Sequence, residues 1–374
     1  MNGKSARLGC LDGLKGIGAC IVAFAWHYQH FGVTQWNALP IHKILPFEFD
    51  QGWLMVELFF MLSGFGIYMG YEERVRTHEV GFKDYILRRI GRLYPLFFAS
   101  TLATIVLECM YMRVAGQTFV YPNFDLYHIF LNLLLMQDGY LGTEWSLNGP
   151  SWCVSICMMM YMLFYFVCYR VRERRHGCYA FAACVVLGLA LVVMGLDCPL
   201  ANVLVGRGTS CFAIGALIAN AYCRGKLSPE RGYAALMVVL AAGVLYRTHG
   251  EQVFGNLQLA FIVGVAPCIV IAAVSIPWLR AFLSLRPFVM LGKLSMALYL
   301  LHYPAQLLFK CTELYAQLDV DYSSMIVWST YVLATLGIAL AYDRILRPRY
   351  EPWVSGLLLN SASGTGCTDR ESSN

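Results

Sequence analysis

Long apolar runs recur from one end of this 374-residue chain to the other, and they constrain the fold more than any other feature. Ten runs can be marked, each close to the roughly 20 residues that a helix needs to cross a bilayer. Only 14% of the residues are charged, too few to coat a water-exposed body, since soluble proteins carry about a quarter. The sequence therefore predicts an all-α, polytopic membrane helical bundle of about ten transmembrane helices. The ten runs cover residues 11–32, 52–71, 93–113, 151–169, 178–196, 203–222, 232–247, 258–275, 288–308 and 324–343.

Positive charge gathers in every second loop between these runs. Lys and Arg lie before the first run and after the second, fourth, sixth, eighth and tenth, whereas the other loops hold few of them. This alternation follows the positive-inside rule for ten helices with both termini in the cytoplasm. We assign residues 1–350 to one transmembrane domain and the polar residues 351–374 to a disordered cytoplasmic tail. The long loop at 114–150 holds a short apolar piece, YHIFLNLLLMQ, suited to a re-entrant or interfacial helix.

Two ionisable residues, Lys15 and His27, lie in the first run. Lys15 is expected near the inner face, and His27 roughly 18 Å further along the helix axis, at about 1.5 Å per residue. A neutral imidazole at that depth can take a proton from a hydroxyl, which makes His27 a candidate general base. The alternatives are a snorkelling anchor for Lys15 and a hydrogen-bonded helix contact for His27. His30 lies three residues on, but no further ligands at a suitable spacing support a metal site, so we expect no metal.

A buried acid and a basic segment follow. Glu57 lies inside the second run, where a carboxylate must pair or stay protonated, so it is a candidate catalytic residue or one half of a structural ion pair. Arg88, Arg89 and Arg92 lie at the inner start of the third run. Guanidinium groups suit phosphate recognition, although three arginines there can also do no more than fix the topology.

The remaining candidates lie in or just before the fourth, sixth and ninth runs. Asn148 belongs to a turn just before the fourth run, and Trp152 begins that run at the interface. Arg207 is a positive group placed against the topology rule, at the outer start of the sixth run. Ser295, Tyr299 and His302 are spaced four and three apart, so they share one face of the ninth run, as the lining of a cavity or as a helix contact.

Five segments, in this order, resemble those of the membrane-bound acyltransferase family 3, whose members are multi-pass O-acyltransferases that modify cell-surface sugars. The resemblance covers about residues 8–350. Each segment alone is a weak signal, whereas five in order along ten apolar runs are specific. The segments are LDGLKGIGACIVAFAWHY, GWLMVELFFMLSGFGIY, FKDYILRRIGRLYPLFF, LNGPSW and LSMALYLLHYP.

The resemblance implies a multi-pass protein of the cell membrane that moves an acyl group from acyl-CoA, usually acetyl-CoA, on the cytoplasmic side. The acceptor would be a hydroxyl of a glycan or lipid-linked sugar at the outer side. The partners would be these two substrates and membrane lipids, without nucleic acid. His27 would be the catalytic histidine, Lys15 the basic residue of the opening motif, and Arg89 and Arg92 the residues that face the donor. Glu57 resembles an acidic position of the family.

The chain departs from the family pattern in three places. Lys15 stands where the family usually has Arg, and a lysine lacks the bidentate fork. Eleven residues separate Lys15 from His27 instead of ten, and twelve helical steps turn the chain by about 120°, so a bulge is needed to restore the register. Cys157 occupies a position where the family often has Glu. Two alternatives therefore stay open: a site that has lost its chemistry, and a transporter or flippase of a lipid-linked sugar. The sequence does not identify the acceptor or the acyl group.

Overall fold

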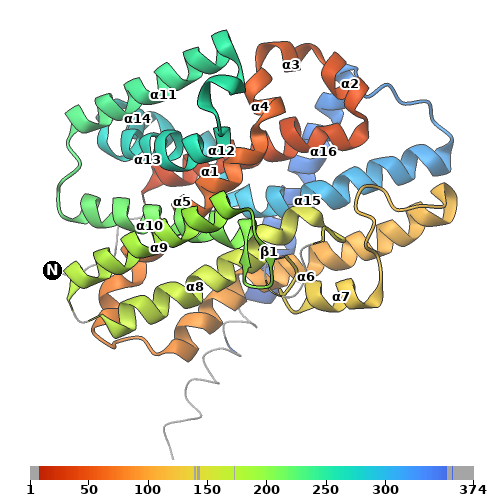
Figure 1. Cartoon of the computed structure of the whole chain (residues 1–374). Coiled ribbons are helices and arrows are strands. Elements are labelled where there is room, and N and C mark those ends of the chain that lie inside the picture. Colours follow the sequence, from red (N-terminus) through yellow and green to blue (C-terminus); the bar gives the residue numbers. More distant parts are fainter. Residues whose placement is uncertain (1–7, 139, 141–143, 172, 352–355, 357–374) are drawn as a thin grey trace, which may run out of the picture.

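The computed structural model describes residues 8–138, 140, 144–171, 173–351 and 356. All ten apolar runs are helical, and the protein is an all-α polytopic bundle (Figure 1). The tail predicted over 351–374 lies outside the described residues, apart from Glu351 and Gly356. The first half of the chain contains α1 (Gly9–Cys20), η1 (Ile21–Trp26), η2 (His27–Phe31), α2 (Val33–Ala38), α3 (Pro40–Ile44), α4 (Pro46–Asp50), η3 (Gly52–Leu54), α5 (Met55–Arg76), α6 (Phe82–Ala115), α7 (Leu126–Leu133), η4 (Gly149–Ser151) and α8 (Trp152–Arg170).

The second half begins with a helix and a two-stranded antiparallel hairpin, and the rest is helical. Strand β1 (Asp197–Cys198) pairs with β2 (Ala201–Asn202). The elements of this half are α9 (Arg174–Met194), the two strands, α10 (Val203–Cys223), α11 (Pro229–His249), η5 (Glu251–Phe254), α12 (Leu257–Ala260), η6 (Phe261–Val265), α13 (Ala266–Ser275), α14 (Pro277–Leu283), α15 (Arg286–Ala316), α16 (Met325–Ala341) and η7 (Tyr342–Leu346).

The number of membrane spans is close to the prediction of ten, without reaching it. Within the described part of the chain, eight helical segments are long and apolar enough to cross a bilayer, or nine if α14 and α15, bent by 61°, form one span. The difference is α11, whose apolar stretch is short because Glu230, Arg231 and Arg247 lie near its ends. The short apolar piece of the loop at 114–150 forms α7, a helix of eight residues.

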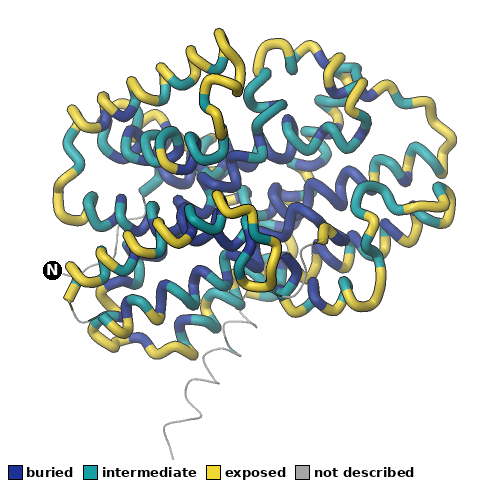
Figure 2. The backbone as a smooth tube through the Cα atoms, in the orientation of Figure 1, coloured by how far each residue is buried: buried dark blue, intermediate teal, exposed yellow. Residues whose placement is uncertain are grey.

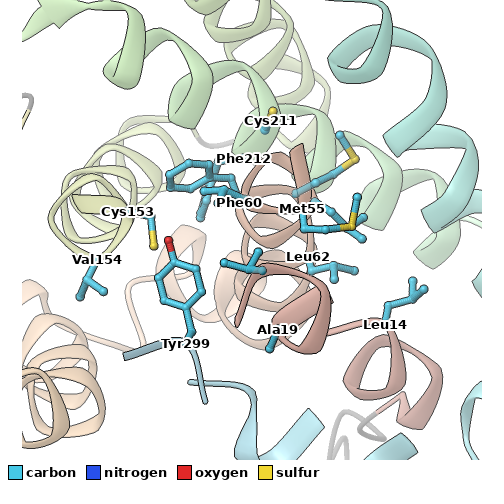
Figure 3. Packing of buried hydrophobic residues seen from close by; sticks show 14 of the residues in the cluster. Leu14, Ala19, Met55, Phe60, Leu62, Cys153, Val154, Cys211, Phe212 and Tyr299 are labelled. Carbon is cyan, nitrogen blue, oxygen red and sulfur yellow. The ribbon is translucent and has the colours of Figure 1, made fainter. Parts of the chain in front are cut away.

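The buried residues concentrate where α1, α5, α10 and α15 meet in the middle of the bundle (Figure 2). Figure 3 shows this packing: Tyr299 of α15 reaches toward Cys153 of α8, with Phe60 of α5 and Phe212 of α10 close by. Apolar helices gain little from one another by burial alone inside a membrane, so close van der Waals contact has to hold them together. Small residues at the contacts supply that closeness.

Two glycines set the distance between α5 and α10. A Cβ atom on Gly64 would lie 2.0 Å from the carbonyl oxygen of Phe212, and one on Gly215 would lie 1.9 Å from that of Met61. These separations are far below van der Waals contact, and the obstacle in both cases is backbone, which cannot rotate away. The two helices can therefore pack in this way only while both positions lack a side chain.

We predict that Gly64→Ala lowers the stability of the protein, because the added methyl group forces α5 and α10 apart. Overpacking of this kind costs about 1–3 kcal/mol. Gly66→Ala is the matched control, since Gly66 lies on the same helix with no atom within 4 Å of its would-be Cβ. Thermal unfolding of the detergent-purified variants measures the difference, and equal melting temperatures for the two variants would contradict the prediction.

Candidate active site

The first helix changes its geometry between Lys15 and His27. Regular α-helix ends at Cys20, a π-helix runs over Ile21–Trp26, and a 3₁₀ segment begins at His27. Twelve regular helical steps would rotate His27 by about 120° relative to Lys15. The wider π turn takes up one extra residue and so removes about 100° of this rotation. This is the bulge that the eleven-residue spacing requires, and such π segments occur often at functional sites.

His27 makes its main side-chain contact with His302 of α15. The Nδ1 atom of His27 lies 2.8 Å from Nε2 of His302, and the His302 side chain is fully buried. The other ring nitrogen of His302, Nδ1, lies 3.2 Å from the carbonyl oxygen of Leu298. The sequence singled out both histidines as candidates on separate helices, and the structure places them in direct contact.

The Leu298 carbonyl determines the tautomers of both neutral rings. A carbonyl oxygen can only accept, so His302 Nδ1 carries the hydrogen and donates it to Leu298. His302 Nε2 is then an acceptor, and the bond from His27 requires that His27 Nδ1 donates. The proton of His27 thus lies on Nδ1, and its Nε2 atom keeps a free lone pair. That atom is therefore able to accept a proton.

Gln306 fixes the third histidine, His30. The Gln306 amide nitrogen donates to the backbone carbonyl of His27 at 2.8 Å. The Gln306 amide oxygen therefore faces His30 Nδ1, 3.0 Å away. His30 therefore donates from Nδ1, and its ring stacks on that of His27 with centroids 4.9 Å apart. The sequence interpretation missed Gln306. The signal was its position four residues after His302, which extends the polar face of Tyr299 and His302 by one turn.

The segment just before α8 is hydrogen-bonded to α15 near His302. Tyr299 donates from its hydroxyl to the carbonyl of Pro150 at 2.7 Å, and Asn148 donates from its amide nitrogen to the carbonyl of Leu300 at 2.9 Å. Both bonds tie η4 to α15 beside His302. The Asn148 Oδ1 atom is buried and accepts no hydrogen bond from any described residue. It is therefore able to accept a further hydrogen bond.

Glu57 and Arg207 form one buried ion pair. Arg207 Nε donates to Glu57 Oε1 at 2.7 Å, and the amide nitrogen of Gln258 donates to the same oxygen at 3.0 Å. The guanidinium lies between two indole rings, 5.3 Å from the Trp53 centroid and 4.8 Å from that of Trp152. The positive-inside rule does not expect a positive charge at this position. A buried counter-ion and two aromatic rings stabilise Arg207 there.

The arginines expected to bind the acyl donor lie near the start of α6, beside the last part of α5. Arg89 donates to the Tyr71 hydroxyl at 2.6 Å and stacks over that ring, 4.7 Å from its centroid. The Nε atom of Arg89 is buried and has no hydrogen-bond partner among the described residues. Arg88 and Arg92 are both exposed. The charges of Arg89 and Arg92 act on the Tyr161 hydroxyl.

Lys15 belongs to this second group. Its charge acts on the Cys157 thiol, beside which Ser63 and Tyr161 share a hydrogen bond of 2.9 Å. The charge of the lysine thus reaches the cysteine, and both residues depart from the family pattern. The Ser295 hydroxyl donates to the Gly292 carbonyl of its own helix at 2.9 Å. Within the described ranges, no group of three or more His, Cys, Asp or Glu side chains is arranged to hold a metal ion.

Comparison with known proteins gives the family of the chain. A sequence model of the acyltransferase 3 family, described as an acyltransferase domain, matches residues 8–344. The chain belongs to this family. A protein of Acidianus two-tailed virus, named "Putative acetyltransferase ORF330", is 32% identical over 111 residues, which are 29% of this chain and 31% of the viral protein. The matching segment thus spans under a third of that relative. No solved structure matches the chain.

The segment after α7 carries a buried acid, Asp138. Burial raises the pKa of its carboxyl to about 7, against an ordinary value of 3.8, and its Oδ1 atom has no described partner. The folded protein therefore binds this proton more tightly than the unfolded chain does. The contribution to stability is complete at low pH and is lost as the pH rises through about 4 to 7.

We predict that Asp138→Asn stabilises the protein at pH 8 and leaves it unchanged near pH 4, because the amide cannot ionise. The gain approaches about 4 kcal/mol, at about 1.4 kcal/mol for each pKa unit. Melting temperatures at the two pH values measure it. Asp125→Asn is the control with the opposite sign, since the Asp125 carboxylate accepts from the His128 backbone at 3.0 Å and its pKa is lowered. A gain for Asp138→Asn that does not depend on pH would be evidence against the buried acid.

Proposed function

We propose that this protein is an O-acyltransferase of the cell membrane, which moves an acyl group, acetyl in the first instance, from cytoplasmic acyl-CoA to a hydroxyl of a glycan at the outer side. Membership of an acyltransferase family and the helical bundle support the class of enzyme. The observation that carries the chemistry is the free lone pair on His27 Nε2, which follows from the hydrogen bonds of His302 to His27 and Leu298.

The proposed reaction begins when His27 Nε2 takes the proton of the acceptor hydroxyl. The hydroxyl oxygen forms a bond to the thioester carbonyl carbon, and the charged His27 ring is stabilised because Nδ1 continues to donate to His302. When the carbon–sulfur bond breaks, the CoA thiolate takes the proton from Nε2. The products are an ester and free CoA, and His27 returns to its starting tautomer.

The donor is proposed to bind beside Arg89 and Arg92, with Arg88 near the entrance. The unsatisfied, buried Nε atom of Arg89 fits a phosphate oxygen of CoA, since a guanidinium binds phosphate through more than one N–H. The positive charge of Lys15 acts on Cys157, and Lys15 precedes His27 in the same candidate span. We propose that Lys15 guides the donor toward the histidines.

The acceptor is proposed to bind among the residues around η4. Asn148 Oδ1 accepts from a sugar hydroxyl, and Trp152 offers an aromatic face that Arg207 and Glu57 hold in place. Tyr299 and His302 form the floor, and Ser295 lies further along the same helix. In this proposal Glu57 acts through Arg207 and does not touch the reacting atoms.

We predict that His27→Ala abolishes acyl transfer, and that His302→Gln retains much more activity than His302→Leu. A glutamine oxygen can still accept from His27 Nδ1, whereas leucine leaves the tautomer undefined. Loss of a general base costs about 10²- to 10⁴-fold. The assay is release of free CoA from acyl-CoA in membranes, with and without a crude surface-glycan fraction, over a range of pH.

Each outcome of that assay has a definite meaning. Release that depends on both His27 and the glycan supports the transferase, and a flippase would leave acyl-CoA intact. Full activity of His27→Ala would overturn the proposed base. Equal activities and pH profiles for His302→Gln and His302→Leu would remove His302 from the reaction and leave it a structural contact.

A second prediction concerns the donor site. Arg89→Gln is expected to raise the KM for acyl-CoA at least about tenfold with a smaller change in kcat, because the loss of one charged phosphate contact costs about 1.5–3 kcal/mol. Arg113→Gln is the matched control, since Arg113 is an exposed arginine at the opposite end of the same helix. Equal KM values for the two variants would exclude Arg89 as a donor contact.

A further inference from the structure

A groove that is separate from the histidines lies between the ends of α15 and α16. Its volume is about 290 Å³, and eight residues from α15, α16 and η7 line it. Three of them are cations, Arg286, Lys293 and Arg344, and one is an acid, Asp343. The other four are apolar, among them Leu340 of α16. Neither of the polar groups described above contributes a lining residue.

The three cations lack a counter-ion. Among the described residues, none of Arg286, Lys293 and Arg344 takes part in an ion pair. The one acid of the groove is already paired, because Asp343 accepts from Arg347 at 3.0 Å. The groove therefore concentrates uncompensated positive charge, which favours an anion.

The walls of the groove indicate which anion. Arg286 and Lys293 are seven residues apart, so they lie two turns apart on one side of α15, with apolar residues of the same helix between them. Met290 and Leu340 are 44% and 40% exposed and lie on helices that belong to the bundle's candidate spans. A ligand with a phosphate and an apolar chain satisfies both parts of this lining.

We propose that the groove binds the phosphate of an anionic membrane lipid, with its headgroup against Arg286, Lys293 and Arg344 and an acyl chain along the apolar wall. The positive-inside rule puts this end of α15 on the cytoplasmic side, where basic groups between transmembrane helices bind anionic headgroups. The site is independent of the proposed acyl transfer, and the protein can lack that activity and still bind the lipid.

The test measures lipid retention by the full-length protein, purified in detergent with equal amounts of phosphatidylglycerol and phosphatidylcholine and analysed by native mass spectrometry. We expect the wild type to prefer phosphatidylglycerol by about tenfold to a hundredfold, since each basic group near a headgroup contributes about 1 kcal/mol. The variant Arg286→Gln, Lys293→Gln and Arg344→Gln is expected to lose this preference, and Lys293→Arg alone to keep it.

A matched control removes three other exposed cations expected on the same side, by Arg170→Gln, Arg224→Gln and Lys226→Gln. This variant should retain the preference, which also separates a specific groove from general charge. Equal loss in both triple variants, or an unchanged preference in the groove variant, would overturn the proposal. Displacement of the lipid by inorganic phosphate would assign the groove to a soluble phosphate and overturn the lipid assignment. Melting temperatures of all variants establish that each one is folded.

Discussion

The close approach of α1 to α15 is the contact on which the proposed chemistry depends. A Cβ atom on Gly16 would lie 2.6 Å from the backbone nitrogen of Gly292, and one on Gly292 would lie 2.1 Å from the carbonyl oxygen of Asp12. The two helices can touch backbone to backbone here because both positions are glycine. Further along the same pair, that separation allows a single hydrogen bond to join His27 and His302.

The π-helix in the first span and this helix contact act together. In a regular helix the one extra residue would rotate His27 away from α15. The close contact at the glycines would then place a different side chain opposite His302. The Ile21–Trp26 segment absorbs that residue without interrupting the helix. Trp36 and Trp328 hold the wider turn, since their indole N–H groups donate to the carbonyls of Ala25 and Phe24. These carbonyls thereby gain partners at a site where helical hydrogen bonding changes.

The polar side chains inside the bundle form two groups with different electrical character. Next to His27 the side chains are imidazole rings and the Gln306 amide, and the buried Glu57 carboxylate is compensated by Arg207. Around Lys15 and Arg89, the charge is positive and no acid occupies the position of Cys157. Such a division suits a reaction in which an anionic donor is held at one place and a proton is moved at another, because stray charge near the base would disturb the proton transfer.

The sequence by itself determined the helical membrane architecture and the family, and it singled out the ionisable residues of the first helix. These depend on composition and on spacing within one segment, which the chain order contains directly. Even the need for a bulge follows from counting the residues between Lys15 and His27. The tertiary structure decided which candidates meet. It showed the hydrogen bond of His27 to His302, the ion pair of Glu57 with Arg207 and the effect of the Lys15 charge on Cys157. It also added Gln306. Contacts of this kind depend on where glycines allow helices to approach and on how each helix is rotated, which no single segment determines.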